Sequence, residues 1–292
     1  MPERRLFHTP GPPRHRAGFP HPRRRRVPPS LWLGGALTVA FALLALVGPT
    51  LLGGDPFVAT AAPFTPPSAG VPFGSDDLGR DVWTGVVHGA SLSLTVGLTV
   101  ALASLLLGLI TGGVAGYAGG WLDDVLMRAA EVVQVLPRFF LALTVVALFG
   151  ASLVNLTLVL ALTSWTVVAR VVRASVLAVK EEVHVDAARA LGGSDLRILV
   201  RHVLPLALGP AVAYAALQVG NAMLVEAGLS FLGFGDPTRV SWGYLLNVAQ
   251  PYVHRAWWLS AFPGAALALA VLGVNLLADG LRGMQPTHGV GH

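Results

Sequence analysis

The chain has 292 residues, of which 54% are hydrophobic and only 12% are charged. A soluble domain carries about twice this charged fraction, so the composition argues against an ordinary soluble protein and indicates an integral membrane protein. The absence of cysteine excludes disulfides, thiolate zinc sites and cysteine nucleophiles. The net charge of +5 comes mainly from arginines beside apolar blocks, where they orient a membrane protein, so we expect no nucleic-acid partner.

The N-terminal segment, residues 1–30, is rich in Arg and Pro and shows no apolar periodicity. It predicts a disordered, basic cytoplasmic tail. The apolar block at 31–53 is long enough to cross a bilayer as a helix. A cleaved signal sequence is the alternative, because Ala59-Thr60-Ala61 resembles a cleavage site. The apolar run is longer than the core of a typical signal sequence, which favours an uncleaved helix.

Further apolar blocks follow a loop at 54–88 that is rich in Pro, Gly and Asp; they lie at 91–114, 126–149, 151–173, 203–226 and 258–278. Because lipid offers no hydrogen bonds to the backbone, these blocks predict an all-α polytopic membrane protein with about six transmembrane helices. A tight hairpin at Gly150 would join the third and fourth spans. A short C-terminal tail would occupy 286–292. We interpret the acidic residues of the first loop, Asp76, Asp77 and Asp81, as a solvated turn with Arg80 and not as a metal site.

The second span ends in glycines spaced by four residues: Gly108, Gly112, Gly116 and Gly120. Such a row lets another helix approach closely, so we expect it to form a packing face.

Arginine counting predicts the orientation. With the N-terminus inside, the loop at 174–201 is also inside, together with most basic residues, including Lys180, Arg189, Arg197 and Arg201. The outside loops then hold only Arg80, Arg239 and Arg255. The positive-inside rule therefore places both termini in the cytoplasm.

The inside loop carries the most informative segment. Residues 181–191 are good helix formers, Gly192-Gly193 would stop the helix, and Ser194 could cap a second short helix. The small residues Ala187 and Ala188 suit docking into a partner's groove. An ordinary solvated connector is the alternative interpretation.

The spacing of Asp186-Ala187-Ala188, Gly192 and Leu204-Pro205 resembles the EAA loop of the membrane subunits of ABC importers. Asp186 replaces the usual Glu and keeps its charge. Three other segments, at 74–82, 226–235 and 257–282, resemble the C-subunit type of permeases from dipeptide, oligopeptide and nickel importers. The resemblance covers roughly residues 31–285.

This resemblance implies a type I ABC importer permease fold in the bacterial plasma (inner) membrane. The implied partners are a second, homologous permease, two cytoplasmic ATP-binding subunits, an extracytoplasmic solute-binding protein and membrane lipid. The coupling helix would lie in the loop at 174–201, and Asp186, Ala187, Ala188, Gly192, Leu204 and Pro205 would carry ATPase coupling. The chain has no phosphate-binding G-x-x-x-x-G-K-[ST] motif, so we expect it to bind no cofactor and to be no enzyme, with ATP used by its partners.

Ionisable residues inside the membrane are candidates for function. Arg128 and Glu131 would form a structural pair on one helix face. Arg138 could contact a solute carboxylate in the translocation path, snorkel to the membrane surface or pair with a carboxylate of a partner subunit. Glu226 could belong to the outer gate. The alternative function is ion-coupled secondary transport. The carboxylates that it would need, Glu131, Glu226 and Asp279, all sit near helix ends, and no inverted repeat is visible.

Overall fold

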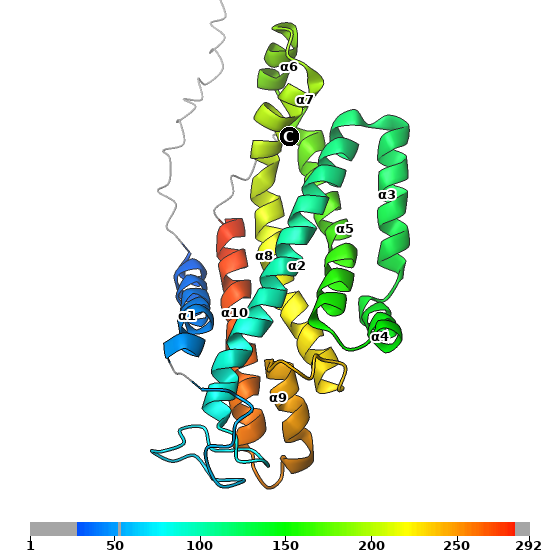
Figure 1. Ribbon diagram of the computed structural model, residues 1–292. Coiled ribbons are helices and arrows are strands. Elements are labelled where there is room, and N and C mark those ends of the chain that lie inside the picture. Colours follow the sequence, from blue (N-terminus) through cyan, green and yellow to red (C-terminus); the bar gives the residue numbers. More distant parts are fainter. Residues whose placement is uncertain (1–27, 52–53, 284–292) are drawn as a thin grey trace, which may run out of the picture.

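The computed structural model describes residues 28–51 and 54–283. This part of the chain is a bundle of helices and contains no β-strand (Figure 1). The predicted C-terminal tail and residues 1–27 of the predicted N-terminal tail lie outside the described residues. Residues 29 and 30, which we assigned to the tail, instead begin the first helix.

Five helices are long and apolar enough to cross a membrane: α1 (Pro29–Leu51), α2 (Val82–Ala118), α5 (Leu153–Val179), α8 (Leu204–Phe231), which continues the helical run from Asp195, and α10 (Trp258–Gly283). They coincide with five of the predicted apolar blocks. The helix α2 begins nine residues before its predicted start, and α5, α8 and α10 end five or six residues past their predicted ends, because the helices continue beyond the apolar blocks. Asp81 begins α2, where its carboxylate accepts hydrogen bonds from the amides of Trp83 and Thr84.

The third predicted span is broken. Its two parts, α3 (Gly120–Val135) and α4 (Arg138–Phe149), meet at an angle of 74°, and the pair supplies the sixth span only if it is counted as one. The continuous helix that we predicted at 126–149 is therefore wrong. The physical reason is Pro137: proline disfavours the helical conformation of the preceding residue, and Leu136 is extended, with φ −74° and ψ 121°.

The long helix α2 lies between α5 and α8, while α1 lies along α10 (Figure 1). The predicted glycine face is confirmed for Gly108, Gly112 and Gly116, which meet α5 at Val168, Ala169 and Arg173. A Cβ atom on Gly112 would fall only 2.2 Å from the Ala169 carbonyl oxygen. The prediction is wrong for Gly120, which begins α3 with a φ of +58° and has open space around it.

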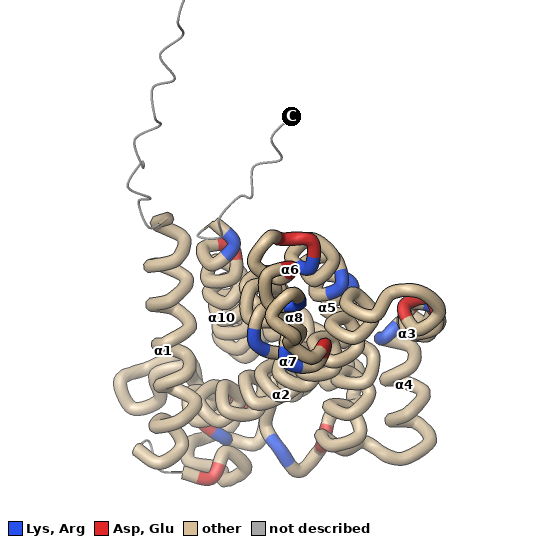
Figure 2. The backbone as a smooth tube through the Cα atoms, turned by 90° about the horizontal axis from the view of Figure 1, so that it is seen from above, with Lys and Arg blue, Asp and Glu red and all other residues tan. Residues whose placement is uncertain are grey.

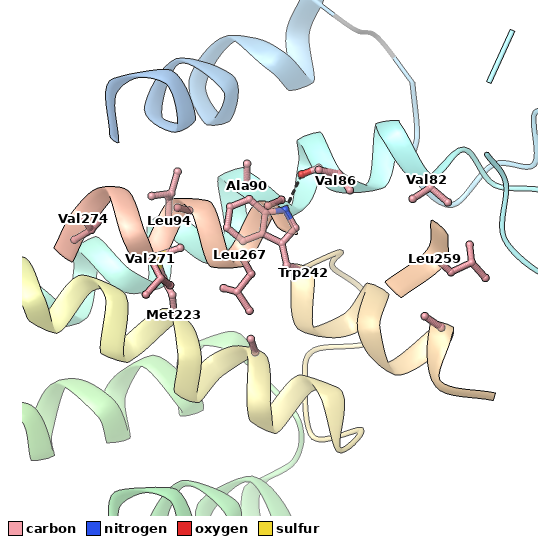
Figure 3. Packing of buried hydrophobic residues seen from close by; sticks show 14 of the residues in the cluster. Val82, Val86, Ala90, Leu94, Met223, Trp242, Leu259, Leu267, Val271 and Val274 are labelled. Atoms are coloured by element: carbon pink, nitrogen blue, oxygen red, sulfur yellow. Dashed lines mark hydrogen bonds between the residues drawn. The ribbon is translucent and has the colours of Figure 1, made fainter. Parts of the chain in front are cut away.

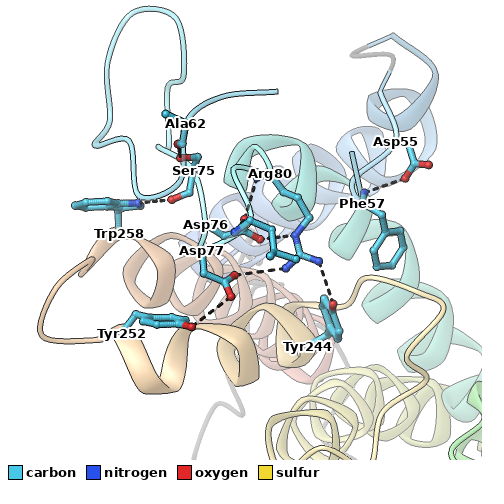
Figure 4. A network of polar contacts seen from close by, with 11 residues as sticks. Asp55, Phe57, Ala62, Ser75, Asp76, Asp77, Arg80, Tyr244, Tyr252 and Trp258 are labelled. Carbon is cyan, nitrogen blue, oxygen red and sulfur yellow. Dashed lines mark hydrogen bonds and ion pairs between the residues drawn. The ribbon is translucent and has the colours of Figure 1, made fainter. Parts of the chain in front are cut away.

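Below α2 in Figure 1, a compact cap is formed by the 54–81 loop, α9 (Trp242–Ala249) and the short helix η2 (Gln250–Tyr252). Arg80 joins the loop to these helices: it pairs with Asp76 at 2.5 Å and with Asp77 at 3.8 Å, and it donates to the Tyr244 hydroxyl (Figure 4).

Burial by itself would lower the pKa of Arg80. The hydrogen bond and the negative charge of Asp76, together with the contact to Tyr244, outweigh the effect of burial and raise this pKa. Asp76 is only 7% exposed, so our interpretation of this turn as solvated is wrong. The carboxylate is buried because Arg80 compensates it.

The largest apolar cluster lies where α2, α8, α9 and α10 meet (Figure 3). Trp242 is fully buried there and donates its indole N–H to the Val86 carbonyl oxygen at 2.9 Å. Gly89 leaves room for the ring, because a Cβ atom there would lie 2.8 Å from Trp242. This packing fixes the cap rigidly to the transmembrane helices.

Candidate functional site

The predicted coupling residues lie at the end of the bundle opposite the cap, around α6 (Val183–Ala190) and α7 (Asp195–Ile198). In the view from above, charged residues of both signs gather around these two helices, while the transmembrane helices behind them are almost free of charge (Figure 2). We call residues 183–198 the α6–α7 segment.

The first helix of this segment is shorter than predicted and begins after Glu182 rather than at Glu181. The Glu182 carbonyl oxygen accepts from the amides of Val185 and Asp186, at 2.9 and 3.4 Å. Among the predicted residues, Asp186 and Ala187 are exposed and Ala188 is half-buried. Arg189 donates to the Asp186 carboxylate at 2.9 Å, one helical turn away.

Gly192 ends α6 as predicted, and its backbone shows why a glycine stands there. Its φ is +79°, in the left-handed region that residues with a Cβ atom rarely adopt. The amides of Gly192 and Gly193 satisfy the last carbonyl oxygens of the helix, those of Arg189 and Ala188, at 2.9 and 3.1 Å.

The second short helix starts after Ser194, as predicted, although the Ser194 side chain makes no capping hydrogen bond. It runs through a π-helical turn, Leu199–Val203, into α8, which begins at Leu204-Pro205. Pro205 explains this turn, because proline has no N–H and its ring clashes with the carbonyl group four residues earlier. The Leu204 side chain packs over Gly113 of α2.

The two sides of the α6–α7 segment differ. Its inner side is anchored by Val185 and Ile198, which are buried in a cluster with residues of α5 and α8. Its outer side exposes Val183 (84%), Leu191 (89%) and Leu196 (72%). Large apolar side chains gathered in one loop and rimmed by charge are typical of a protein-binding surface.

One ion pair near this end of the bundle was not predicted. Arg173 of α5 holds Asp123 of α3 through two parallel hydrogen bonds of 2.6 Å. This bidentate geometry is the strongest form of an arginine–carboxylate contact. The only signal in the sequence was that both residues stand at helix ends on the same side of the membrane.

Arg138 is the first residue of α4 and therefore stands directly at the break in the third span. It is half-buried, and no carboxylate of the described residues lies within ion-pair distance of it. A cation at a helix N-terminus is opposed by the helix dipole, so an anion from outside this chain would stabilise it.

Glu226 lies near the opposite end of α8 from the α6–α7 segment and is only 1% exposed. Its carboxylate accepts a hydrogen bond from Ser230 at 2.7 Å and a longer one from Ser93 of α2 at 3.4 Å. No ion pair joins Glu226 to Arg138 within the described residues. Within the described residues, Glu226 joins helices to each other.

The other carboxylates that we considered for ion coupling have basic partners. Glu131 pairs with Arg128 at 3.5 Å, as predicted, and Asp279 pairs with Arg282 at 3.7 Å. The side chains of Glu131 and Asp279 are both more than half exposed. Neither forms a buried carboxylate site.

Residues 104–285 match the family described as "Binding-protein-dependent transport system inner membrane component". The matched region includes the α6–α7 segment and the broken span.

Two curated relatives align over nearly the whole chain. A protein of Brucella suis biovar 1 (strain 1330), provisionally named a peptide transport system permease, is 40% identical over 266 residues, covering 89% of this chain and 87% of the relative. The dipeptide transport system permease protein DppC of Alkalihalophilus pseudofirmus (strain ATCC BAA-2126 / JCM 17055 / OF4) is 36% identical over 253 residues, covering 86% and 83% of the two chains.

Proposed function

Because this chain belongs to the family of binding-protein-dependent transport system inner membrane components, with the type I ABC importer permease fold, we propose that it forms half of the translocation path of an ATP-driven peptide importer. The observation that carries the proposal is the α6–α7 segment: an exposed apolar surface on a base anchored in the bundle. The relatives named for peptides and dipeptides support the choice of solute.

In this proposal the α6–α7 segment docks on one of two cytoplasmic ATP-binding subunits. The exposed side chains of Val183, Leu191 and Leu196 enter a groove of that subunit, and Asp186 contributes a charge at the rim. ATP is bound and hydrolysed by these partners. Closure of the ATPases then moves the permease helices as rigid bodies, which opens the path alternately to the two sides.

The other half of the path comes from a second, homologous permease, and an extracytoplasmic solute-binding protein delivers the solute at the cap. Both termini of the chain are then cytoplasmic. We assign Arg138 to the path, where it would attract the carboxylate of a peptide, since its position at the start of α4 favours an anion. Glu226 would act at the outer end of the path as a support of the gate helices.

The first test is to tag the chain in its own host, purify it in mild detergent and identify the proteins that accompany it by mass spectrometry. We expect a second permease and one or two ATPases. An intact, stable preparation that contains the chain alone would count against an ABC importer.

The same preparation tests the docking surface. Asp186→Lys should recover several-fold less ATPase, because it reverses a charge and breaks the contact with Arg189. Glu181→Lys is the matched control, since it makes the same charge change at an exposed residue just before α6. Equal ATPase recovery from both variants would contradict the docking role of Asp186.

The role of Arg138 is tested by uptake of a radiolabelled dipeptide into proteoliposomes that contain the full complex. Arg138→Gln should raise the KM by about tenfold, the value of one charge-assisted hydrogen bond, while Arg138→Lys keeps part of the affinity. Arg128→Gln, which removes an exposed arginine of α3, is the control. An unchanged KM in Arg138→Gln would remove Arg138 from the path.

A further inference from the structure

The last turn of α2 lies beneath the α6–α7 segment and carries Tyr117. Its hydroxyl donates a hydrogen bond to the Asp195 carboxylate, the first residue of α7, at 2.9 Å. The guanidinium group of Arg189 in α6 lies close enough to the same hydroxyl group to interact with it. The Tyr117 ring packs against the buried apolar cluster that contains Val185 and Ile198. One side chain of α2 therefore contacts both short helices.

The polar contacts around this hydroxyl are continuous. Arg189 holds Asp186 on its other side at 2.9 Å. The interaction with Tyr117, together with the hydrogen bond to Asp186, raises the pKa of Arg189. One residue before Tyr117, the Gly116 carbonyl oxygen accepts a hydrogen bond from the Lys180 ammonium group, just past the end of α5, at 3.1 Å. The end of α2 therefore contacts both short helices and the residue that follows α5.

The two short helices need such contacts with a longer helix to hold their positions. The helix α6 has eight residues and α7 has four, and helices of this length are not stable by themselves in water. They are joined by Gly192-Gly193, which has little conformational restriction of its own. A force applied to α6 alone could therefore bend the chain at these glycines instead of reaching α7 and α8.

We propose that Tyr117 is a positioning residue that fixes α6 and α7 to the end of α2, so that the two helices and α2 move as one unit. Its consequence for transport rests on the proposed function, because it assumes that an ATPase binds the α6–α7 segment. The positioning of α6 and α7 by Tyr117 depends only on contacts within this chain.

The positioning role of Tyr117 is tested by hydrogen–deuterium exchange of the full chain in lipid nanodiscs. Tyr117→Phe removes the hydroxyl and keeps the ring, so amides of residues 183–198 should exchange up to about tenfold faster, the effect of losing one hydrogen bond to a charged group. Tyr214→Phe is the matched control: Tyr214 packs against the same cluster, and no side-chain hydrogen bond of Tyr214 is seen in the described part of the chain. Unchanged exchange in Tyr117→Phe would overturn the proposal.

A second measurement separates positioning from general stability. In proteoliposomes with the complete complex, we would measure radiolabelled dialanine uptake and ATP hydrolysis together. Tyr117→Phe should lower the number of dipeptides transported per ATP several-fold at an equal amount of assembled complex. A parallel loss of uptake and hydrolysis at an unchanged ratio would indicate a merely structural residue and contradict the proposal.

A double variant identifies the partner. If Tyr117 acts through Asp195, Tyr117→Phe combined with Asp195→Asn should lower the ratio no further than the more severe single variant, whereas multiplied effects would exclude that route. If the wild-type complex transported no dipeptide, the proposed function would be contradicted. The positioning role of Tyr117 would not be, because the exchange measurement requires neither ATPase nor solute.

Discussion

At the scale of single residues, Gly192 decides where the helix α6 ends. Its φ of +79° costs a residue with a Cβ atom about 1–2 kcal/mol, and more for a β-branched side chain. Gly192→Val should therefore displace the α6–α7 segment and lower peptide uptake severalfold, while membrane insertion stays normal. Uptake and expression are measured together in the intact host.

The control for this prediction is Gly192→Asn, because asparagine tolerates left-handed backbone better than other residues with a Cβ atom. It adds a side chain into open space, since nothing lies within 4 Å of a Cβ atom at this position. Wild-type uptake in both variants would show that the position of the helix end is unimportant for coupling.

The pair of Asp123 and Arg173 is a second feature at this scale. Arg173→Ala leaves a largely buried carboxylate without its partner, so we expect a loss of about 1–3 kcal/mol of stability and a lower melting temperature in detergent. The exchanged pair, Asp123→Arg with Arg173→Asp, should restore part of this loss. A melting temperature that is the same in the single variant and the wild type would mean that the pair does not hold α3 against α5.

At the scale of helices, the glycines of α2 set how closely it packs on α5. Gly112→Leu would place a side chain where the Ala169 carbonyl oxygen now lies, at 2.2 Å from the new Cβ atom. Overpacking of this kind costs at least about 1–3 kcal/mol, so the melting temperature should fall markedly. Gly35→Leu in α1, where nothing lies within 4 Å, is the control and should melt like the wild type. Equal melting of both variants would show that α2 and α5 separate without cost.

At the scale of the whole molecule, the α6–α7 segment and the cap lie at opposite ends of the bundle, so they must face opposite sides of the membrane (Figure 1). The natural chain has no cysteine, which allows single exposed cysteines to be introduced and labelled. A membrane-impermeant maleimide should label Ser68→Cys in intact spheroplasts and Ser194→Cys only after permeabilisation. The reverse pattern would invert the predicted orientation.

Much of this arrangement could be predicted from the sequence, because it depends on local properties of the chain. Apolar length determines which blocks can span the bilayer. Five of the predicted blocks coincide with long helices, although α2 begins earlier than predicted and the third block is broken at Pro137. Gly192 and Pro205 impose backbone conformations by their own chemistry. The spacing of Asp186-Ala187-Ala188, Gly192 and Leu204-Pro205, together with the three other segments, likewise indicated the family.

Only the tertiary structure decided which distant residues meet. The contacts of Arg173 with Asp123 and of Tyr117 with Asp195 depend on which helices become neighbours, and no local pattern encodes this. Burial of Asp76 likewise required knowledge of how the cap folds around Arg80. Hydrophobicity and backbone preference act along the chain, whereas pairing and burial are properties of helices packed against each other, and so they appeared only with the fold.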